Sequence, residues 1–134
     1  MVELDNYKVE LSSYEQPLAE VRDSLNLGDK RYRIEELEKN MEAPDFWDDS
    51  EKASQAMKEV KDLKDIVGRA DGLQQKYEDI MTLIEMAYEE EDESVLPEIE
   101  EELNAFEEGY ESLRIQTLLS GEYDKYNAIV TLHA

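Results

Sequence analysis

Cysteine is absent from this 134-residue chain, and histidine occurs once, as His133. Without cysteine the chain has no disulfides, thiolate metal ligands or cysteine nucleophiles, which fits a reducing compartment. A single histidine leaves no credible Ser-His-Asp arrangement and none of the Glu-x-x-His pairs of a bundle-type di-iron site. No Gly-x-Gly-x-x-Gly or Walker sequence is present to cradle phosphate. We therefore expect no catalytic residue, no metal site, no cofactor and no enzymatic activity in this chain.

Long apolar runs are also lacking, and none approaches the roughly 20 residues that a membrane-spanning helix needs. The first residues, Met1-Val2-Glu3-Leu4-Asp5, do not resemble a secretory signal, which has a positive start and an apolar core. The sequence therefore predicts a cytoplasmic protein that begins at its natural start.

Basic residues are few, since 14 Lys and Arg stand against 36 Asp and Glu and give a net charge of −22. Between Tyr77 and Leu113 there is no basic residue, whereas the same window holds 15 acidic ones. Binding to a phosphate backbone depends on clustered Lys and Arg, and an anionic membrane surface would repel this chain. We therefore expect neither direct nucleic-acid binding nor membrane binding.

The acidic runs from Glu89 to Glu93 and from Glu100 to Glu102 invite comparison with calcium sites. Neither run has the alternating oxygen ligands and the turn-making glycine of an EF-hand loop. We interpret both as solvated acidic faces.

Apolar residues recur at alternating spacings of three and four, which is the period of an amphipathic α-helix. The first such stripe predicts a helix over residues 3–25, in which Pro17 favours a kink over a restart capped by Ser13 and Gln16. This stripe consists of Leu4, Tyr7, Leu11, Tyr14, Leu18, Val21 and Leu25.

Three further helices are predicted over residues 29–42, 51–89 and 95–118. Asp29 and Ser94 are the expected N-caps of the first and last of these. Gly68 and Gly72 predict a bend or local unwinding in the longest helix. The segment from Glu89 to Glu93 would reverse the chain.

The predicted fold class is all-α, because the two long helices should pack antiparallel with the N-terminal helices in their groove. We expect an elongated antiparallel helical bundle or coiled-coil hairpin that forms an acidic helical domain over residues 1–118. Residues 119–134 are predicted to be a linker and an unpaired C-terminal β-strand, since Ile129, Val130 and Thr131 are β-branched. A strand needs a neighbour, so we expect it to be the first strand of a missing α/β domain.

Phe46 and Trp47 are the candidate contact residues for a partner, because they stand in the short link between two predicted helices. The competing interpretation is that both aromatics close the end of the helical bundle. The sequence alone favours this second interpretation, and it describes the chain as an acidic helical interaction module fused to something else.

The acidic helical hairpin and three sequence segments resemble the N-terminal part of bacterial peptide chain release factor 2. The three segments are the linker Ala43-Pro44-Asp45-Phe46-Trp47-Asp48-Asp49, the turn Leu118-Leu119-Ser120-Gly121-Glu122-Tyr123-Asp124, and the strand Asn127-Ala128-Ile129-Val130-Thr131-Leu132-His133-Ala134. The resemblance covers the whole chain. The Phe-Trp-Asp-Asp linker and the Ser-Gly-Glu-Tyr-Asp turn are closer to this family than to its sister, release factor 1.

The resemblance implies a function in translation termination, in which the whole factor recognises UAA or UGA and triggers hydrolysis of peptidyl-tRNA. This chain has neither the Ser-Pro-Phe tripeptide of codon recognition nor the Gly-Gly-Gln motif of the family. The resemblance therefore assigns no catalytic or codon-reading residue here. It implies that this domain positions the factor near the large-subunit stalk base of the ribosome, against ribosomal protein, while the remaining domains of the same polypeptide bind RNA.

Two alternatives come from other functional classes. A stand-alone acidic coiled-coil adaptor or holdase would require the gene to end soon after Ala134. A nucleic-acid mimic would use its Glu-rich helices to occupy a basic DNA-binding protein, and its capture would depend strongly on salt. The Ser-Gly-Glu-Tyr-Asp turn and the terminal strand have no role in such a mimic.

Overall fold

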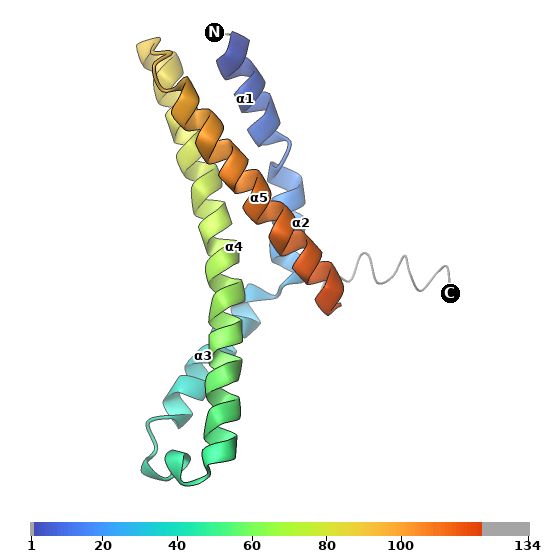
Figure 1. The fold of residues 1–134 in the computed structure, drawn as a ribbon, viewed down its shortest axis with the longest axis vertical. Helices are drawn as coiled ribbons and strands as arrows, with labels where there is room; N and C mark the ends of the chain where they lie inside the picture. The colour runs from blue at the N-terminus through green and yellow to red at the C-terminus, as the bar shows by residue number, and fades with distance from the viewer. Residues whose placement is uncertain (1, 122–134) are drawn as a thin grey trace, which may run out of the picture. The chain divides into compact units, whose positions relative to one another are not determined.

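The computed structural model describes residues 2–121 of the chain, and this part consists of helices joined by short turns. Its helices are α1 (Val2–Ser12), α2 (Glu15–Ser24), α3 (Leu27–Asn40), the 3₁₀ helix η1 (Pro44–Asp48), α4 (Ser50–Glu90) and α5 (Leu96–Ser120) (Figure 1). The predicted all-α class is confirmed. The predicted C-terminal strand lies outside the described residues.

The helices form two compact units, each with its own buried core. The α5 unit contains α1, α2, the part of α4 from Asp71 onward and α5. The α3 unit contains α3, η1 and the part of α4 up to Ala70.

In the α5 unit, α1 and α2 pack along α5, and the second part of α4 runs antiparallel to α5 (Figure 1). The apolar stripes predicted from the sequence supply the buried side chains. From α1, α2 and their junction to α3 these are Leu4, Leu11, Leu18, Val21 and Leu25, and from α5 they are Ile99, Leu103, Phe106, Tyr110 and Leu113.

The first helical segment is two helices, so the preference for one kinked helix was wrong. Proline has no N–H, and it is tolerated only in a first helical turn, where no intrahelical partner is needed. Accordingly α1 ends at Ser12 and Pro17 occupies the first turn of α2. A capping box does not form either, because the Ser13 hydroxyl donates to the Glu10 carbonyl at 2.6 Å.

The reversal after α4 is a Schellman motif, the commonest way in which a helix satisfies its last carbonyls. The Asp92 N–H donates to the Ala87 carbonyl at 3.0 Å, and the Glu91 N–H donates to the Tyr88 carbonyl at 3.3 Å. Glu91 takes the left-handed conformation, with φ of 50°. Ser94 is not the N-cap of α5, because its hydroxyl and N–H both donate to the Asp92 carboxylate.

The α3 unit is a helical hairpin closed by apolar residues from both helices. Its core consists of Ile34, Leu37 and Val60, with Met41, Ala56, Leu63 and Val67 packed around them. Asn26, in the left-handed conformation with φ of 51°, precedes α3, so Asp29 lies inside the helix and is not its cap. The helix α4 is continuous from Ser50 to Glu90, so the local unwinding considered near Gly68 and Gly72 does not occur.

Candidate interaction surface

The segment between α3 and α4, residues 43–49, is called the aromatic turn here because it carries Phe46 and Trp47. Its conformation follows from Pro44, whose ring forces the preceding residue into extended backbone. Ala43 accordingly has φ of −69° and ψ of 133°, and its carbonyl accepts the Phe46 N–H at 3.1 Å. Asp49 ends the turn as a side-chain cap of α4, accepting the Lys52 N–H at 3.1 Å.

The two aromatic rings of the turn meet edge to face, with centroids 4.8 Å apart and planes at 85°. Phe46 is half-buried and lines a hollow whose other apolar lining residues are Leu37, Ala43 and Ala56. Trp47 leaves 52% of its surface exposed. Phe46 therefore contacts the end of the hairpin, whereas the larger part of Trp47 faces solvent.

Acidic residues are concentrated in and beside the aromatic turn. Between Glu42 and Lys52 the sequence holds five acidic residues and one basic residue. Asp45 and Asp49 line the hollow together with Lys52, and Asp48 directly follows Trp47. The aromatic turn thus combines an exposed tryptophan with a segment of net negative charge.

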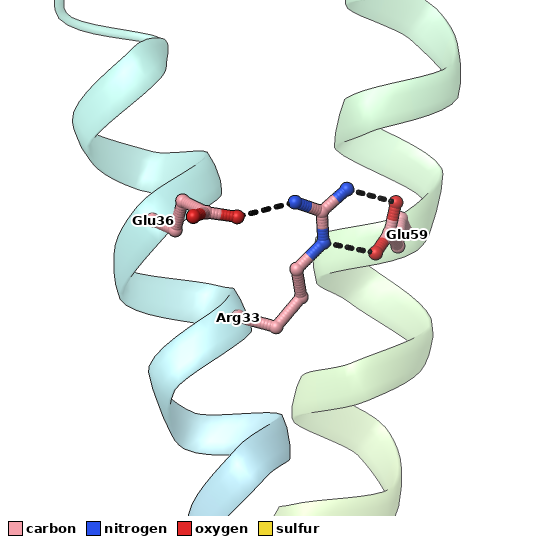
Figure 2. Close-up of polar contacts among 3 residues, drawn as sticks. All are labelled: Arg33, Glu36 and Glu59. Carbon is pink, nitrogen blue, oxygen red and sulfur yellow. Dashed lines mark hydrogen bonds and ion pairs between the residues drawn. The ribbon is translucent and has the colours of Figure 1, made fainter.

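Arg33 joins the two helices that carry the aromatic turn (Figure 2). Its guanidinium donates to both carboxylate oxygens of Glu59 on α4, at 2.7 and 3.2 Å, and to Glu36 on α3 at 2.5 Å. Hydrogen bonds from Arg33 lower the pKa of Glu59, and the same contacts raise the pKa of Arg33. Such a bidentate pair adds geometric specificity to the charge contact, so Arg33 links α3 to α4 beside their shared apolar core.

The α5 unit places carboxylates of α1 and α5 face to face. A hydrogen bond with Glu107 raises the pKa of Glu10, with burial and repulsion between the two groups adding to the effect. Burial and a hydrogen bond to Glu107 raise the pKa of Tyr14 to about 12. Tyr7 has a raised pKa from burial and from its contact with Glu100. One carboxyl of the Glu10 and Glu107 pair therefore retains its proton to a higher pH than an isolated glutamate.

Among residues 2–121, no group of three or more His, Cys, Asp or Glu side chains is arranged to hold a metal ion. The helices of this part of the chain include none that is long and apolar enough to cross a membrane.

Sequence reasoning singled out Phe46 and Trp47, and the structure brings them into contact with each other. It missed Arg33 and the Glu10 and Glu107 pair. The partners in each case come from helices that are distant in sequence, and no local pattern indicates which charged side chains will meet. For Arg33 the only available signal was the i, i+3 spacing to Glu36.

Comparison with known proteins finds relatives that share one name. A protein of Clostridium perfringens named peptide chain release factor 2 is 38% identical over 133 residues, covering 99% of this chain and 36% of the relative. Proteins of the same name from Exiguobacterium and Nitratiruptor are each 36% identical over 132 residues. The chain thus spans 36% of the length of these curated relatives.

The sequence profile of the PCRF domain matches residues 30–134, which is more than half of the chain. The resemblance to release factor 2 drawn from the linker and the C-terminal turn is thereby confirmed. On this evidence the chain belongs to the PCRF domain family, whose members among its relatives are bacterial peptide chain release factors.

Proposed function

We propose that this chain is the helical positioning domain of a class I release factor that reads UAA and UGA in the bacterial cytoplasm. The observation that carries the proposal is the alignment with release factor 2 over 99% of the chain. In this proposal the domain holds the factor on the large ribosomal subunit near the stalk base, and it takes no part in the chemistry of peptide release. The absence of a Gly-Gly-Gln sequence from the chain supports this division of labour.

Charge supports a protein contact over an RNA contact. The net charge of −22 opposes approach to ribosomal RNA, since binding to phosphates depends on Lys and Arg. A basic ribosomal protein would instead be attracted, because complementary potentials steer association and raise its rate. The domain therefore contacts ribosomal protein at the stalk base, and the rest of the factor binds RNA.

The test is codon-dependent peptide release by the factor made from the uninterrupted gene, compared with the same factor lacking residues 1–115. A positioning domain contributes mainly to affinity and rate of binding. We therefore expect the shortened factor to need a higher concentration for half-maximal release and to retain release at saturation.

Release from ribosomes programmed with a sense codon serves as the control for specificity. Complete loss of release at saturating shortened factor would overturn the proposal, because it would assign the domain an essential part in the reaction. An intact gene product no heavier than the 15.6 kDa of this chain would also overturn it and favour a stand-alone adaptor.

A further inference from the structure

We propose that the aromatic turn is a docking surface for a lysine- and arginine-rich segment of a protein, with Trp47 as its anchor. The inference rests on the proposed function for the identity of the partner, a basic ribosomal protein of the stalk base. It adds which surface of the domain makes the contact and what chemistry the partner must present.

Trp47 is exposed yet held in place. Its ring abuts Phe46 edge to face at 4.8 Å, and Phe46 is half-buried and lines a hollow with Leu37, Ala43 and Ala56. Pro44 restricts the backbone of the turn, and the Asp49 cap fixes the point where α4 begins. A partner would therefore meet an aromatic side chain that is already ordered, so little conformational entropy is lost on binding. Tryptophan is one of the residue types enriched at the energetic centres of protein interfaces.

The charges around Trp47 select the occupant. Asp45 and Asp48 are exposed on either side of the ring in the sequence, and Asp49 lines the hollow. A lysine or arginine can lay its aliphatic stem and cationic head against an indole ring while its charge meets neighbouring carboxylates. The hollow beside Phe46 accepts an apolar side chain from the same segment. An RNA phosphate backbone would face these carboxylates with like charge.

The second exposed aromatic of the α3 unit provides a contrast. Tyr32 leaves 69% of its surface exposed, but it lines a hollow with Lys39, Glu35 and Glu36. Glu36 is paired with Arg33, and Lys39 adds a positive charge. The hollow beside Phe46 likewise has two carboxylates and a lysine, so the contrast is that Glu36 at the Tyr32 hollow is already paired with Arg33. Tyr32 is more exposed than Trp47, and it serves as a matched control position.

The experiment exploits the fact that the chain has one tryptophan. The 134-residue chain is made with 5-fluorotryptophan, so that Trp47 gives a single fluorine resonance. Two probes are titrated separately: the purified, RNA-free stalk-base ribosomal protein, and the stalk-base RNA fragment without protein. We expect a saturable shift of the resonance with the protein and none with the RNA.

Affinity is then measured by calorimetry for two pairs of variants. Trp47→Ala should weaken binding of the ribosomal protein by about tenfold or more, and Tyr32→Ala by less than about threefold. Asp45→Asn combined with Asp48→Asn should weaken binding several-fold more than Glu89→Gln combined with Glu90→Gln. The second double variant removes the same charge from exposed positions at the end of α4, in the α5 unit, so it measures long-range attraction alone.

Each other outcome overturns the inference. A fluorine shift with RNA alone would identify a different class of partner. Binding of the ribosomal protein without a shift at Trp47, or equal weakening by both double variants, would place the contact elsewhere and leave the proposed function standing. Absence of binding to the ribosomal protein would exclude this occupant, whereas the proposed function is decided separately by the release assay with the shortened factor.

Discussion

Tyr14 lies edge-on against Phe106, with ring centroids 5.4 Å apart and planes at 89°. Tyr14 stands at the break between α1 and α2, and Phe106 is a fully buried residue of α5. Tyr110 and Tyr77 complete the cluster, at 5.2 Å from Tyr14 and 6.1 Å from Phe106 respectively. The helix break before Pro17 is thus held against α5 by an aromatic contact. This contact helps both α1 and α2 to pack on α5.

Replacing Phe106 by alanine should strongly destabilise the α5 unit. The side chain has no exposed surface, so its removal leaves a cavity and loses the ring contacts with Tyr14 and Tyr77. We expect a loss of about 3 to 5 kcal/mol in the free energy of unfolding, measured by urea denaturation followed by circular dichroism. Phe106→Leu, which keeps most of the volume, should cost less than about 2 kcal/mol. A loss below about 1 kcal/mol for the alanine variant would contradict the role of this cluster.

Helical period was the strongest signal in the sequence, and it predicted the core because burial obeys that period. Leu4, Leu11, Leu18 and Val21 are all buried where the first stripe expects them. The same stripe misled the interpretation of Pro17, since an apolar seam continues across a break when both helices pack on one neighbour. The restriction that proline places on the backbone, and not the apolar stripe, decides that the helix ends before Pro17.

The charged contacts were beyond prediction for a different reason. Arg33 and Glu59 are 26 residues apart, and their meeting depends on the register of α3 against α4. Several of the 36 acidic residues were equally suitable partners from the sequence alone. For the aromatic turn, the sequence placed Phe46 and Trp47 between two helices, as the structure does. Their unequal exposure depends on the tertiary fold, since two neighbouring aromatics in a link give no local sign of which ring is covered.

Glu91→Gly should stabilise the chain. Glu91 occupies the left-handed position of the Schellman motif after α4, with φ of 50°, where a residue with a side chain is strained. Glycine adopts this conformation without strain, so we expect a gain of about 1 kcal/mol in the free energy of unfolding. Thermal denaturation at fixed ionic strength would measure it.

Glu91→Ala is the control for charge, because Glu91 stands among other acidic residues. The alanine variant removes the same charge but keeps the strained backbone. If it stabilised the chain as much as Glu91→Gly, relief of repulsion would explain the gain and the backbone argument would be wrong.

The facing carboxylates Glu10 and Glu107 predict a dependence of stability on pH. Because the native pKa of Glu10 is raised above its usual 4.5, the native chain binds this proton more tightly than the unfolded chain does. The stabilisation is therefore complete below the unfolded pKa and is lost as pH rises through the raised native value. Glu10→Gln abolishes this titration, so at pH 7 it should be more stable than the wild type by about 0.5 kcal/mol, a small effect because Glu10 is largely exposed to solvent.

The advantage of Glu10→Gln should shrink as pH falls toward 5, which keeps the protein above its isoelectric point near 4.2. Glu111→Gln is a control in which the expected change in stability has the opposite sign. Glu111 accepts hydrogen bonds from Arg114, which lower its pKa, so its replacement should destabilise the chain at pH 7. Equal stability of Glu10→Gln and wild type at pH 7, with no change at pH 5, would show that the two carboxylates do not interact.

Two helical glycines of the α5 unit should respond differently to alanine. A Cβ atom added at Gly72 meets nothing within 4 Å, whereas one at Gly109 comes within 3.0 Å of Leu73 Cδ2. Alanine favours the helix over glycine by about 0.8 to 1 kcal/mol at either site. Gly72→Ala should therefore gain most of that amount, while Gly109→Ala must displace the buried Leu73 and should gain less or lose stability. The double variant Gly109→Ala with Leu73→Ala separates the steric effect from the helix preference. Leu73→Ala removes the atom that the new Cβ approaches, so in its background Gly109→Ala should show the helix preference alone. If Gly109→Ala alone stabilised the chain as much as Gly72→Ala, the close packing of α4 against α5 at this point would be disproved.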